Sequence, residues 1–274
     1  METIHAQGAE VPALGLGTWQ LTGQACRETV STALELGYRH VDTAQAYGNE
    51  RQVGAGIEDA DVDRDELFLV TKLDVRNRTT ERVRRSARES LEKLGTDYLD
   101  LLLIHQPNIP FLASLDETLD AMNDLVDEGV VRHIGVSNFP TGMLKRARET
   151  SAAPILTDQV QYHPYWDQRK LLTYCQIHDV LLTAYSPLAR GGVLDDPLLV
   201  TVGNRYGKSP AQVALRWLVQ QEGVVTVPKA SSPEHLEENL AVFDFELTDE
   251  EMARIRNPDR VKTGVHFLRS QLPF

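Results

Sequence analysis

The chain has 274 residues and a mass of 30.7 kDa, enough to bury a large core in one big α/β domain or in two smaller ones. Of its residues, 42% are hydrophobic and 25% are charged, a composition that is typical of globular proteins and excludes a disordered one. The net charge of −12 disfavours nucleic acid and anionic membranes as partners, because both require a basic surface.

No run approaches the roughly 18 apolar residues of a membrane span, and the N-terminus lacks the basic and then apolar pattern of a secretory signal. We therefore expect a cytoplasmic protein. The acidic excess, with 7 Lys against 21 Arg, fits either a salt-adapted host or a GC-rich genome. Cys26 and Cys175 are far apart, and the histidines include no pair at ligand spacing, so we expect no metal site.

The predicted elements begin with residues 1–15, an alternating segment that we expect to form a β-hairpin around Gly8 and to close one end of a barrel. Short apolar runs then alternate with amphipathic stretches, two of which end at Gly95 and Gly129, where helix C-caps are expected. Eight such units predict a single (β/α)8 TIM barrel domain over residues 1–274. The expected strands are 13–17, 38–42, 67–72, 98–105, 130–138, 155–161, 180–186 and 223–229.

Two phosphate-binding patterns are incomplete in this sequence. A doubly wound open sheet, the rival fold, normally has a glycine-rich dinucleotide loop after its first strand, but the segment from Gly15 to Gln20 stops at its second glycine. The segment 203–209, "GNRYGKS", resembles a P-loop whose glycines are one residue too close. It is better explained as a helix start, with Ser209 as N-cap and Gln212 completing a capping box.

Polar residues end seven of the eight expected strands. Each one alone has a structural explanation, such as a cap, a solvated strand end or a hydrogen-bonded core histidine. Because the carboxyl ends of the strands form the active-site face of a (β/α)8 barrel, together they predict one site. These residues are Asp42, Lys72, His105, Ser137, Asn138, Gln159, Tyr185, Ser186 and Lys229.

Asp42, Tyr47, Lys72 and His105 are suited to proton donation. An unperturbed tyrosine has a pKa of about 10, and we expect the Lys72 ammonium to lower the pKa of Tyr47 while Asp42 keeps the lysine charged. A neutral His105 would orient a carbonyl group. The set contains no nucleophile for acyl transfer, so it predicts a general acid beside hydride transfer to a carbonyl.

At these residues the sequence resembles the aldo-keto reductase family, in particular compact, diketogluconate reductase-like microbial members, from Val11 to about Asn239. The motifs are "VPALGLGTWQ", "GYRHVDTAQAYGNE", "FLVTKL", "DLLLIHQP", "HIGVSNF", "DQVQYHPY", "TAYSPLARG" and "VPKASSPEHLEEN". The resemblance implies a barrel that binds a nicotinamide cofactor without a Rossmann loop and reduces aldehydes or ketones. It implies a catalytic tetrad of Asp42, Tyr47, Lys72 and His105, with Tyr47 as general acid.

The resemblance also implies cofactor contacts, which run from the carboxamide and the nicotinamide ring through the pyrophosphate and ribose phosphate to the adenine. In that order they are Ser137, Asn138, Gln159, Tyr185, Ser186, Leu188, Gly191, Lys229, Ser231, Ser232, His235, Glu238 and Asn239. The substrate would contact Trp19, Tyr47, His105 and Gln106.

The sequence departs from the family pattern at three positions. Ala230 replaces a serine and His235 an arginine near the expected 2′-phosphate, which removes a hydroxyl and a planar cation. We therefore expect NADPH to be used and NADH to be tolerated. Gln106 replaces a tryptophan and, if it points inward, makes the substrate pocket roomier and more polar.

The short segment 106–114 and the tail 265–274, which we expect to fold over the opening, suggest small aldehydes, α-dicarbonyls or keto-sugar acids as substrates. The resemblance to the family also implies a monomer. Two alternatives remain. One is a cofactor-binding regulatory or sensing subunit, which the complete tetrad disfavours. The other is a cofactor-free isomerase or lyase, which the segment from Lys229 to Asn239 disfavours.

Overall fold

The structure is a computed structural model that describes residues 2–107 and 113–256. Its centre is an eight-stranded sheet in which strands pair in chain order from β3 to β10, all parallel. Each predicted run overlaps one observed strand. The strands are β3 (Leu16–Gly17), β4 (His40–Asp42), β5 (Phe68–Leu73), β6 (Leu99–Ile104), β7 (Val131–Ser137), β8 (Ile155–Gln161), β9 (Leu181–Tyr185) and β10 (Val224–Thr226).

The sheet closes on itself between its first and last strands. The backbone N–H of Gly15 donates to the carbonyl of Thr226 over 2.8 Å, and that of Gly17 donates to Pro228 over 3.0 Å. A Cβ at Gly17 would lie 2.6 Å from the Val227 carbonyl oxygen, so this close approach requires glycine. The predicted (β/α)8 barrel is confirmed.

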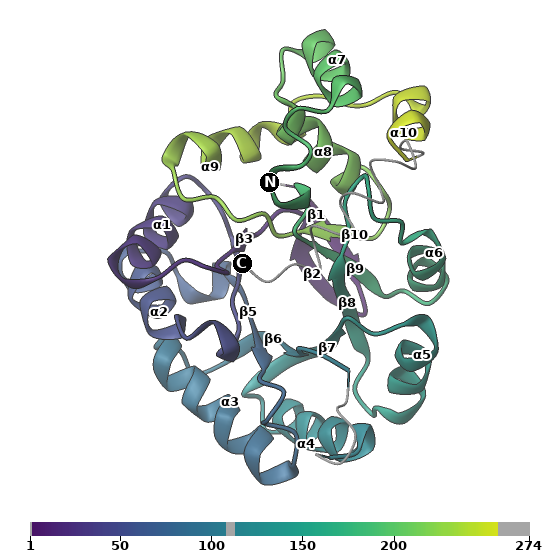
Figure 1. The fold of residues 1–274 in the computed structure, drawn as a ribbon. Helices are drawn as coiled ribbons and strands as arrows, with labels where there is room; N and C mark the ends of the chain where they lie inside the picture. The colour runs from purple at the N-terminus through teal and green to yellow at the C-terminus, as the bar shows by residue number, and fades with distance from the viewer. Residues whose placement is uncertain (1, 108–112, 257–274) are drawn as a thin grey trace.

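Helices follow the strands and form a ring around them, with α7 and α10 outside that ring (Figure 1). Arg205 on α7 and Glu251 on α10 join these two additions through an ion pair of 2.9 Å. The helices are α1 (Gly23–Glu35), α2 (Glu50–Asp59), α3 (Thr80–Leu94), α4 (Leu115–Asp127), α5 (Thr141–Thr150), α6 (Arg169–Ile177), α7 (Pro197–Tyr206), α8 (Pro210–Val219), α9 (Pro233–Leu240) and α10 (Asp249–Arg256).

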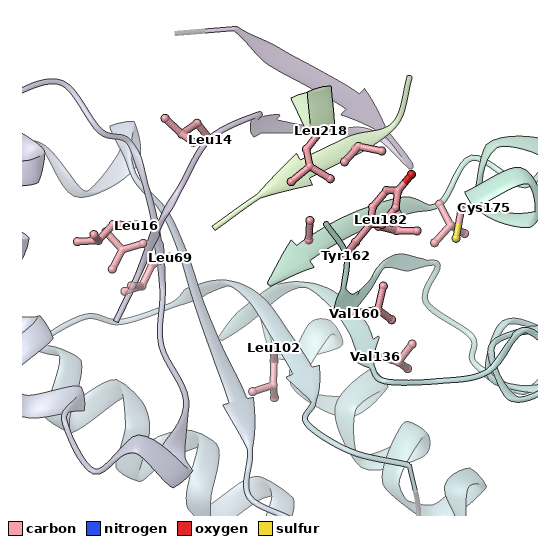
Figure 2. Close-up of a cluster of buried hydrophobic side chains, with 14 of the residues drawn as sticks. Leu14, Leu16, Leu69, Leu102, Val136, Val160, Tyr162, Cys175, Leu182 and Leu218 are labelled. Carbon is pink, nitrogen blue, oxygen red and sulfur yellow. The ribbon is translucent and has the colours of Figure 1, made fainter. Parts of the chain in front are cut away.

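The main core lies between the sheet and the helices. Leu69, Leu102 and Val136 are buried with side chains from the helices, such as Cys175 and Leu218 (Figure 2). Because side chains alternate along a strand, the intervening residues point into the barrel. No helix within the described ranges is long and apolar enough to cross a bilayer.

The N-terminal hairpin of β1 (Thr3–Ala6) and β2 (Ala9–Pro12) closes the end of the barrel where the strands begin. It packs on a second buried cluster, made by inward side chains near the strand starts, and the His40 Nδ1 donates to the Pro12 carbonyl over 3.2 Å. The predicted plug is confirmed. The cluster contains Ala6, Ala9, Val11, Phe68, Val70, Leu101, Leu103, Leu156, Leu181 and Val225.

Local signals in the sequence also match the structure. Gly95 has a φ of 68° after α3, as a C-cap requires, and Ser209 and Gln212 form the predicted capping box of α8. The P-loop interpretation of this segment is therefore wrong. Cys26 and Cys175 are buried free thiols on α1 and α6, and burial raises their pKa values to about 11 and about 12. Across residues 2–107 and 113–256, no three His, Cys, Asp or Glu side chains are grouped for a metal ion.

Candidate active site

A cavity of about 350 Å³ opens at the carboxyl ends of the strands, opposite the hairpin. It brings together side chains from most of the loops that follow the strands, as the sequence predicted. The predicted residues that line it are Trp19, Asp42, Tyr47, His105, Gln106, Ser137, Asn138, Gln159, Tyr185, Ser186 and Lys229.

Lys72 lies directly beneath this cavity and is fully buried. Its ammonium donates to Asp42 Oδ1 over 2.6 Å, to the Thr43 carbonyl over 2.8 Å and to the Tyr47 hydroxyl over 3.4 Å. Burial alone would lower the pKa of Lys72, but the charge of Asp42 and the contact with Tyr47 outweigh it and raise the pKa above its ordinary value. Lys72 is therefore a buried cation with an acceptor for each of its three protons.

Asp42 connects the lysine to a second group of residues. Its Oδ1 pairs with Lys72, while its Oδ2 accepts a hydrogen bond of 2.7 Å from Gln159 Nε2. Both oxygens of this buried carboxylate therefore have a partner, which offsets the cost of removing the charge from water.

Tyr47 ends a 3₁₀ turn, Gln45–Tyr47, in the loop after β4. The next residue, Gly48, has a φ of 68°, and the buried Asn49 then donates from Nδ2 to the carbonyls of Thr18 and Leu21. The turn presents the hydroxyl of Tyr47 to Lys72 at the floor of the cavity.

The direction of the Tyr47 pKa shift corrects one prediction. We expected Lys72 to lower the pKa below the ordinary value of tyrosine, but burial raises it by more than the nearby ammonium of Lys72 lowers it. The sequence identified the nearby cation, but it did not show how deeply the Tyr47 side chain is buried. Tyr47 is therefore protonated at neutral pH, as a proton donor must be.

His105 follows β6 and faces Tyr47, with ring centroids 5.8 Å apart and planes at 80°. Burial, and then the charge of Lys72, lower the pKa of His105 to about 4. The imidazole is therefore neutral at physiological pH, as predicted. Its backbone carbonyl accepts a 3.1 Å hydrogen bond from Asn138 Nδ2, which holds the loop after β6 against the end of β7.

The predicted carboxamide and ring contacts form one hydrogen-bonded group. Ser137 Oγ donates to the Gln159 carbonyl over 2.7 Å, and Asn138 Nδ2 donates to Ser137 Oγ over 2.9 Å. The Tyr185 hydroxyl donates to Asn138 Oδ1 over 2.8 Å. Asn138 and Ser186 have φ values of 63° and 50°, so the backbone is strained at these two residues of the cavity wall.

A second cavity, also of about 350 Å³, continues the first along the loop after β9. The two share Trp19, Ser186, Arg190 and Lys229, and the second is also lined by the predicted residues Leu188 and Gly191. Arg190, whose guanidinium lies 5.5 Å from the Trp19 ring centroid, was not among the predicted residues. Its position in the sequence between the predicted contacts Leu188 and Gly191 could have indicated that it lines the same cavity.

Of the residues predicted for the ribose phosphate and the adenine, Lys229 lines both cavities, whereas the others lie farther along, at the start of α9 and on it, and line neither. Ser232 is the N-cap of α9 and accepts from the backbone N–H of His235, whose side chain is exposed. Asn239 is buried beside the hydroxyl of Tyr38, which donates to the Leu236 carbonyl over 3.1 Å. Ser231 lies 3.5 Å from the Lys229 ammonium, and Glu238 is partly buried.

Known proteins match this sequence and this fold. The model of the Aldo/keto reductase family matches residues 13–259. The methylglyoxal reductase DkgA of Escherichia coli strain K12 is 39% identical, over 93% of this chain and 92% of the relative. The 9,11-endoperoxide prostaglandin H2 reductase of Trypanosoma cruzi is also 39% identical, over 92% and 89%. A crystal structure provisionally assigned as a 2,5-diketo-D-gluconic acid reductase B has a TM-score of 0.91 and 46% identity, over 93% and 90% of the two chains.

The fold is a (β/α)8 barrel with a polar rim at the carboxyl ends of its strands. The chain belongs to the aldo-keto reductase family, and it is therefore an oxidoreductase of a family that reduces carbonyl groups.

Proposed function

We propose that this protein reduces small aldehydes or ketones to alcohols with NADPH, and that Tyr47 donates the proton. The observation that carries the proposal is the contact of a buried Lys72 ammonium with both Asp42 and the Tyr47 hydroxyl at the floor of the cavity. A protonated phenol beside a fixed cation is suited to stabilising negative charge that develops on a carbonyl oxygen.

Each member of the tetrad has a separate task. Tyr47 donates its proton to the carbonyl oxygen, and the neutral His105 donates a hydrogen bond that orients the carbonyl. Lys72 favours the phenolate that remains, because its ammonium lies 3.4 Å from the hydroxyl oxygen. Asp42 keeps Lys72 charged and in place.

The residues along the two connected cavities fit an extended nicotinamide cofactor. When bound, this cofactor supplies a hydride to the carbonyl carbon. Gln159, Asn138 and Ser137 would hold the carboxamide, and Tyr185 would pack on the ring. Ser186, Leu188 and Gly191, with the cation of Arg190 nearby, would follow the pyrophosphate. Ser231, Ser232, Glu238 and Asn239 would contact the adenosine end.

We propose that NADPH is the usual cofactor and that NADH is tolerated. Lys229 is exposed and supplies one cation, but Ala230 offers no hydroxyl and His235 no permanent charge. Replacing His235→Arg should raise the ratio of kcat/KM for NADPH to that for NADH about tenfold, which corresponds to one bidentate phosphate contact. A strong NADPH preference in the wild type that is undiminished in His235→Ala would contradict a relaxed site.

The substrate proposed is a small aldehyde, an α-dicarbonyl or a keto-sugar acid. It is supported by the exposed Gln106, which lines the cavity where the family pattern has a tryptophan, and by the names of two relatives. A third relative, as identical to this chain as DkgA, is named for a prostaglandin substrate, so a panel of substrates has to decide the substrate class. The tail 265–274 and most of the segment 106–114, from which the sequence argument also started, lie outside the described residues.

The test compares wild type with Tyr47→Phe in an assay that follows NADPH oxidation with a panel of aldehydes, dicarbonyls and keto acids. We expect turnover by the wild type and a loss of about 10²- to 10⁴-fold in Tyr47→Phe, the usual contribution of a positioned acid. Tyr174→Phe on α6, remote from the cavity, is the matched control. Cofactor binding without turnover in the wild type would support a sensing subunit, and full activity in Tyr47→Phe would contradict the proton donor.

We also propose that the chain is a single barrel domain and acts as a monomer. One sedimenting species of about the mass of one chain, together with a single unfolding transition, is the expected result.

A further inference from the structure

The loop between β5 and α3, residues 74–79, lies between the two loops that carry Tyr47 and His105. Two side chains without a role in the tetrad tie it to both neighbours. Gln45 reaches into it from the Tyr47 turn, and Arg78 reaches out of it to the residue after His105.

Gln45 begins the turn that ends at Tyr47, and its amide uses all of its hydrogen-bonding groups. Its Oε1 accepts from the backbone N–H of Asp74 over 2.9 Å and from Asn77 Nδ2 over 3.0 Å. Its Nε2 donates to the Ser86 carbonyl over 3.2 Å and to Ser90 Oγ over 3.1 Å. The Tyr47 turn is therefore fastened to the 74–79 loop and to α3.

Arg78 is only 3% exposed, and its NH2 donates a short hydrogen bond to the Gln106 carbonyl. Among the described residues, no carboxylate pairs with this guanidinium and its NH1 has no acceptor. The loop is anchored on its other side, where the hydroxyl of Thr118 on α4 donates to the Arg78 carbonyl over 2.8 Å. A buried cation with so few partners among the described residues disfavours folding, so a contribution to stability does not account for Arg78.

We propose that Gln45 and Arg78 are positioning residues that hold Tyr47 and His105 at a fixed separation through the 74–79 loop. This inference rests on the proposed reductase function, and it assigns the two side chains to the rate of the chemical step rather than to cofactor affinity. The geometry is sensitive because the contact of Lys72 with the Tyr47 hydroxyl, at 3.4 Å, is already long for a hydrogen bond. A displacement of about 1 Å at a reacting group can reduce a rate about 10²-fold.

The variants are Gln45→Met, Arg78→Met and their combination, because methionine keeps most of the volume and removes the hydrogen bonds. Gln24→Met on α1 and Arg146→Met on α5 are matched controls, since both side chains are exposed and remote from the cavity. Arg78→Lys keeps a cationic donor for the Gln106 carbonyl and is the conservative rescue.

The kinetic measurements are kcat, KM for the carbonyl, the dissociation constant of NADPH, and the isotope effect on kcat with NADPH deuterated at the transferred position. We expect each methionine variant to lower kcat about 10- to 100-fold, to leave cofactor affinity within about twofold, and to increase the isotope effect. The combined variant should lose less than the product of the single losses, because both residues hold one loop. Arg78→Lys should recover most of the rate.

Two further measurements do not depend on turnover. Crystal structures of the methionine variants should show the 5.8 Å separation of the Tyr47 and His105 rings changed. In an NMR titration, Arg78→Met should raise the pKa of His105, because the charge of Arg78 lowers that pKa. Burial and the charge of Lys72 should still keep the pKa below 6.5, although Asp42 and Asp74 act to raise it.

The outcomes separate the two proposals. A wild type that reduces no carbonyl contradicts the proposed function, and the ring separation and the His105 titration still decide the role of the loop. Methionine variants with the kcat and isotope effect of the controls, or with unmoved rings and an unchanged His105 pKa, would overturn the positioning role. A lower melting temperature with an unchanged kcat would show that the two side chains serve stability alone.

Discussion

The two ends of the barrel are built from the same strands but have opposite chemistry. On β5 the inward side chains are Phe68, Val70 and Lys72, in that order. Phe68 and Val70 belong to the apolar layer beneath the hairpin, whereas Lys72 lies beneath the cavity at the other end, with Asp42 as its ionic partner. One inward row thus forms an apolar layer at one end and a buried ion pair at the other, and the buried charge is tolerated only where partners surround it.

Breaking the charged end should have the largest effect. We expect Lys72→Met to lower kcat about 10³-fold or more, about 4 kcal/mol of activation free energy, because the Tyr47 hydroxyl loses its cation. It should also lower the free energy of unfolding by about 3–5 kcal/mol, since Asp42 is left as an uncompensated buried charge. Steady-state kinetics and urea unfolding measure the two effects. Combining Lys72→Met with Asp42→Asn should restore much of the stability and none of the activity.

Breaking the apolar end should affect only folding. We expect Phe68→Ala to lower the free energy of unfolding by about 3–4 kcal/mol, because it opens a cavity between the hairpin and the His40 ring, whose centroid is 5.3 Å away. Urea unfolding measures this loss. The kcat of the folded variant should stay within about twofold of the wild type, and a tenfold fall would mean that the two ends are coupled.

The pH dependence of carbonyl reduction tests the protonation states of the rim. We expect the rate to be level through neutral pH, because reduction needs a protonated Tyr47 and a neutral His105. It should fall at acid pH as His105 binds a proton near its pKa of about 4, and at alkaline pH only above the ordinary tyrosine value of about 10. A tenfold loss of kcat/KM between pH 7 and 9 would contradict the raised pKa of Tyr47.

The smallest expected effects are on stability, at two buried aspartates outside the cavity. They test whether a buried charge is tolerated only where partners surround it. Asp158 on β8 accepts one 3.4 Å hydrogen bond from the Phe139 N–H, and within the described ranges its Oδ2 has no partner. Asp100 on β6 pairs with Arg64 and Arg132. We expect Asp158→Asn to stabilise the fold by on the order of 1–2 kcal/mol at neutral pH, and Asp100→Asn to destabilise it.

The sign of the pH dependence of stability follows from the direction of the Asp158 pKa shift. Burial raises the pKa of Asp158 well above 3.8, so above that pH the unfolded chain releases a proton that the folded chain keeps, and stability falls as the pH rises. The gain from Asp158→Asn should therefore be small near pH 4 and grow toward pH 8. Thermal unfolding across this range measures it, and a gain independent of pH would contradict the explanation.

Much of the fold could be predicted because its signals are local. The alternation of apolar runs with amphipathic stretches, the glycine at Gly95 and the capping box at Ser209 depend on neighbours within a few residues. The tetrad could be predicted because strand ends converge on one face of a barrel, although Asp42 and His105 are far apart in the chain.

The rest required the packed structure. Gln45 and Arg78 have ordinary local surroundings, and only the arrangement of the loops after β4, β5 and β6 shows that they join Tyr47 to His105. Arg190 likewise gains its place in the cavity from a strained loop, with a φ of 54°.

The sequence by itself determined which groups meet at the rim: an acid, a phenol, an ammonium and an imidazole. Only the tertiary structure decided their protonation. The cation expected to lower the pKa of Tyr47 was correctly identified, but burial outweighs it, and burial is a property of the whole fold. Proximity can follow from topology alone, whereas desolvation depends on every side chain that excludes water from the site.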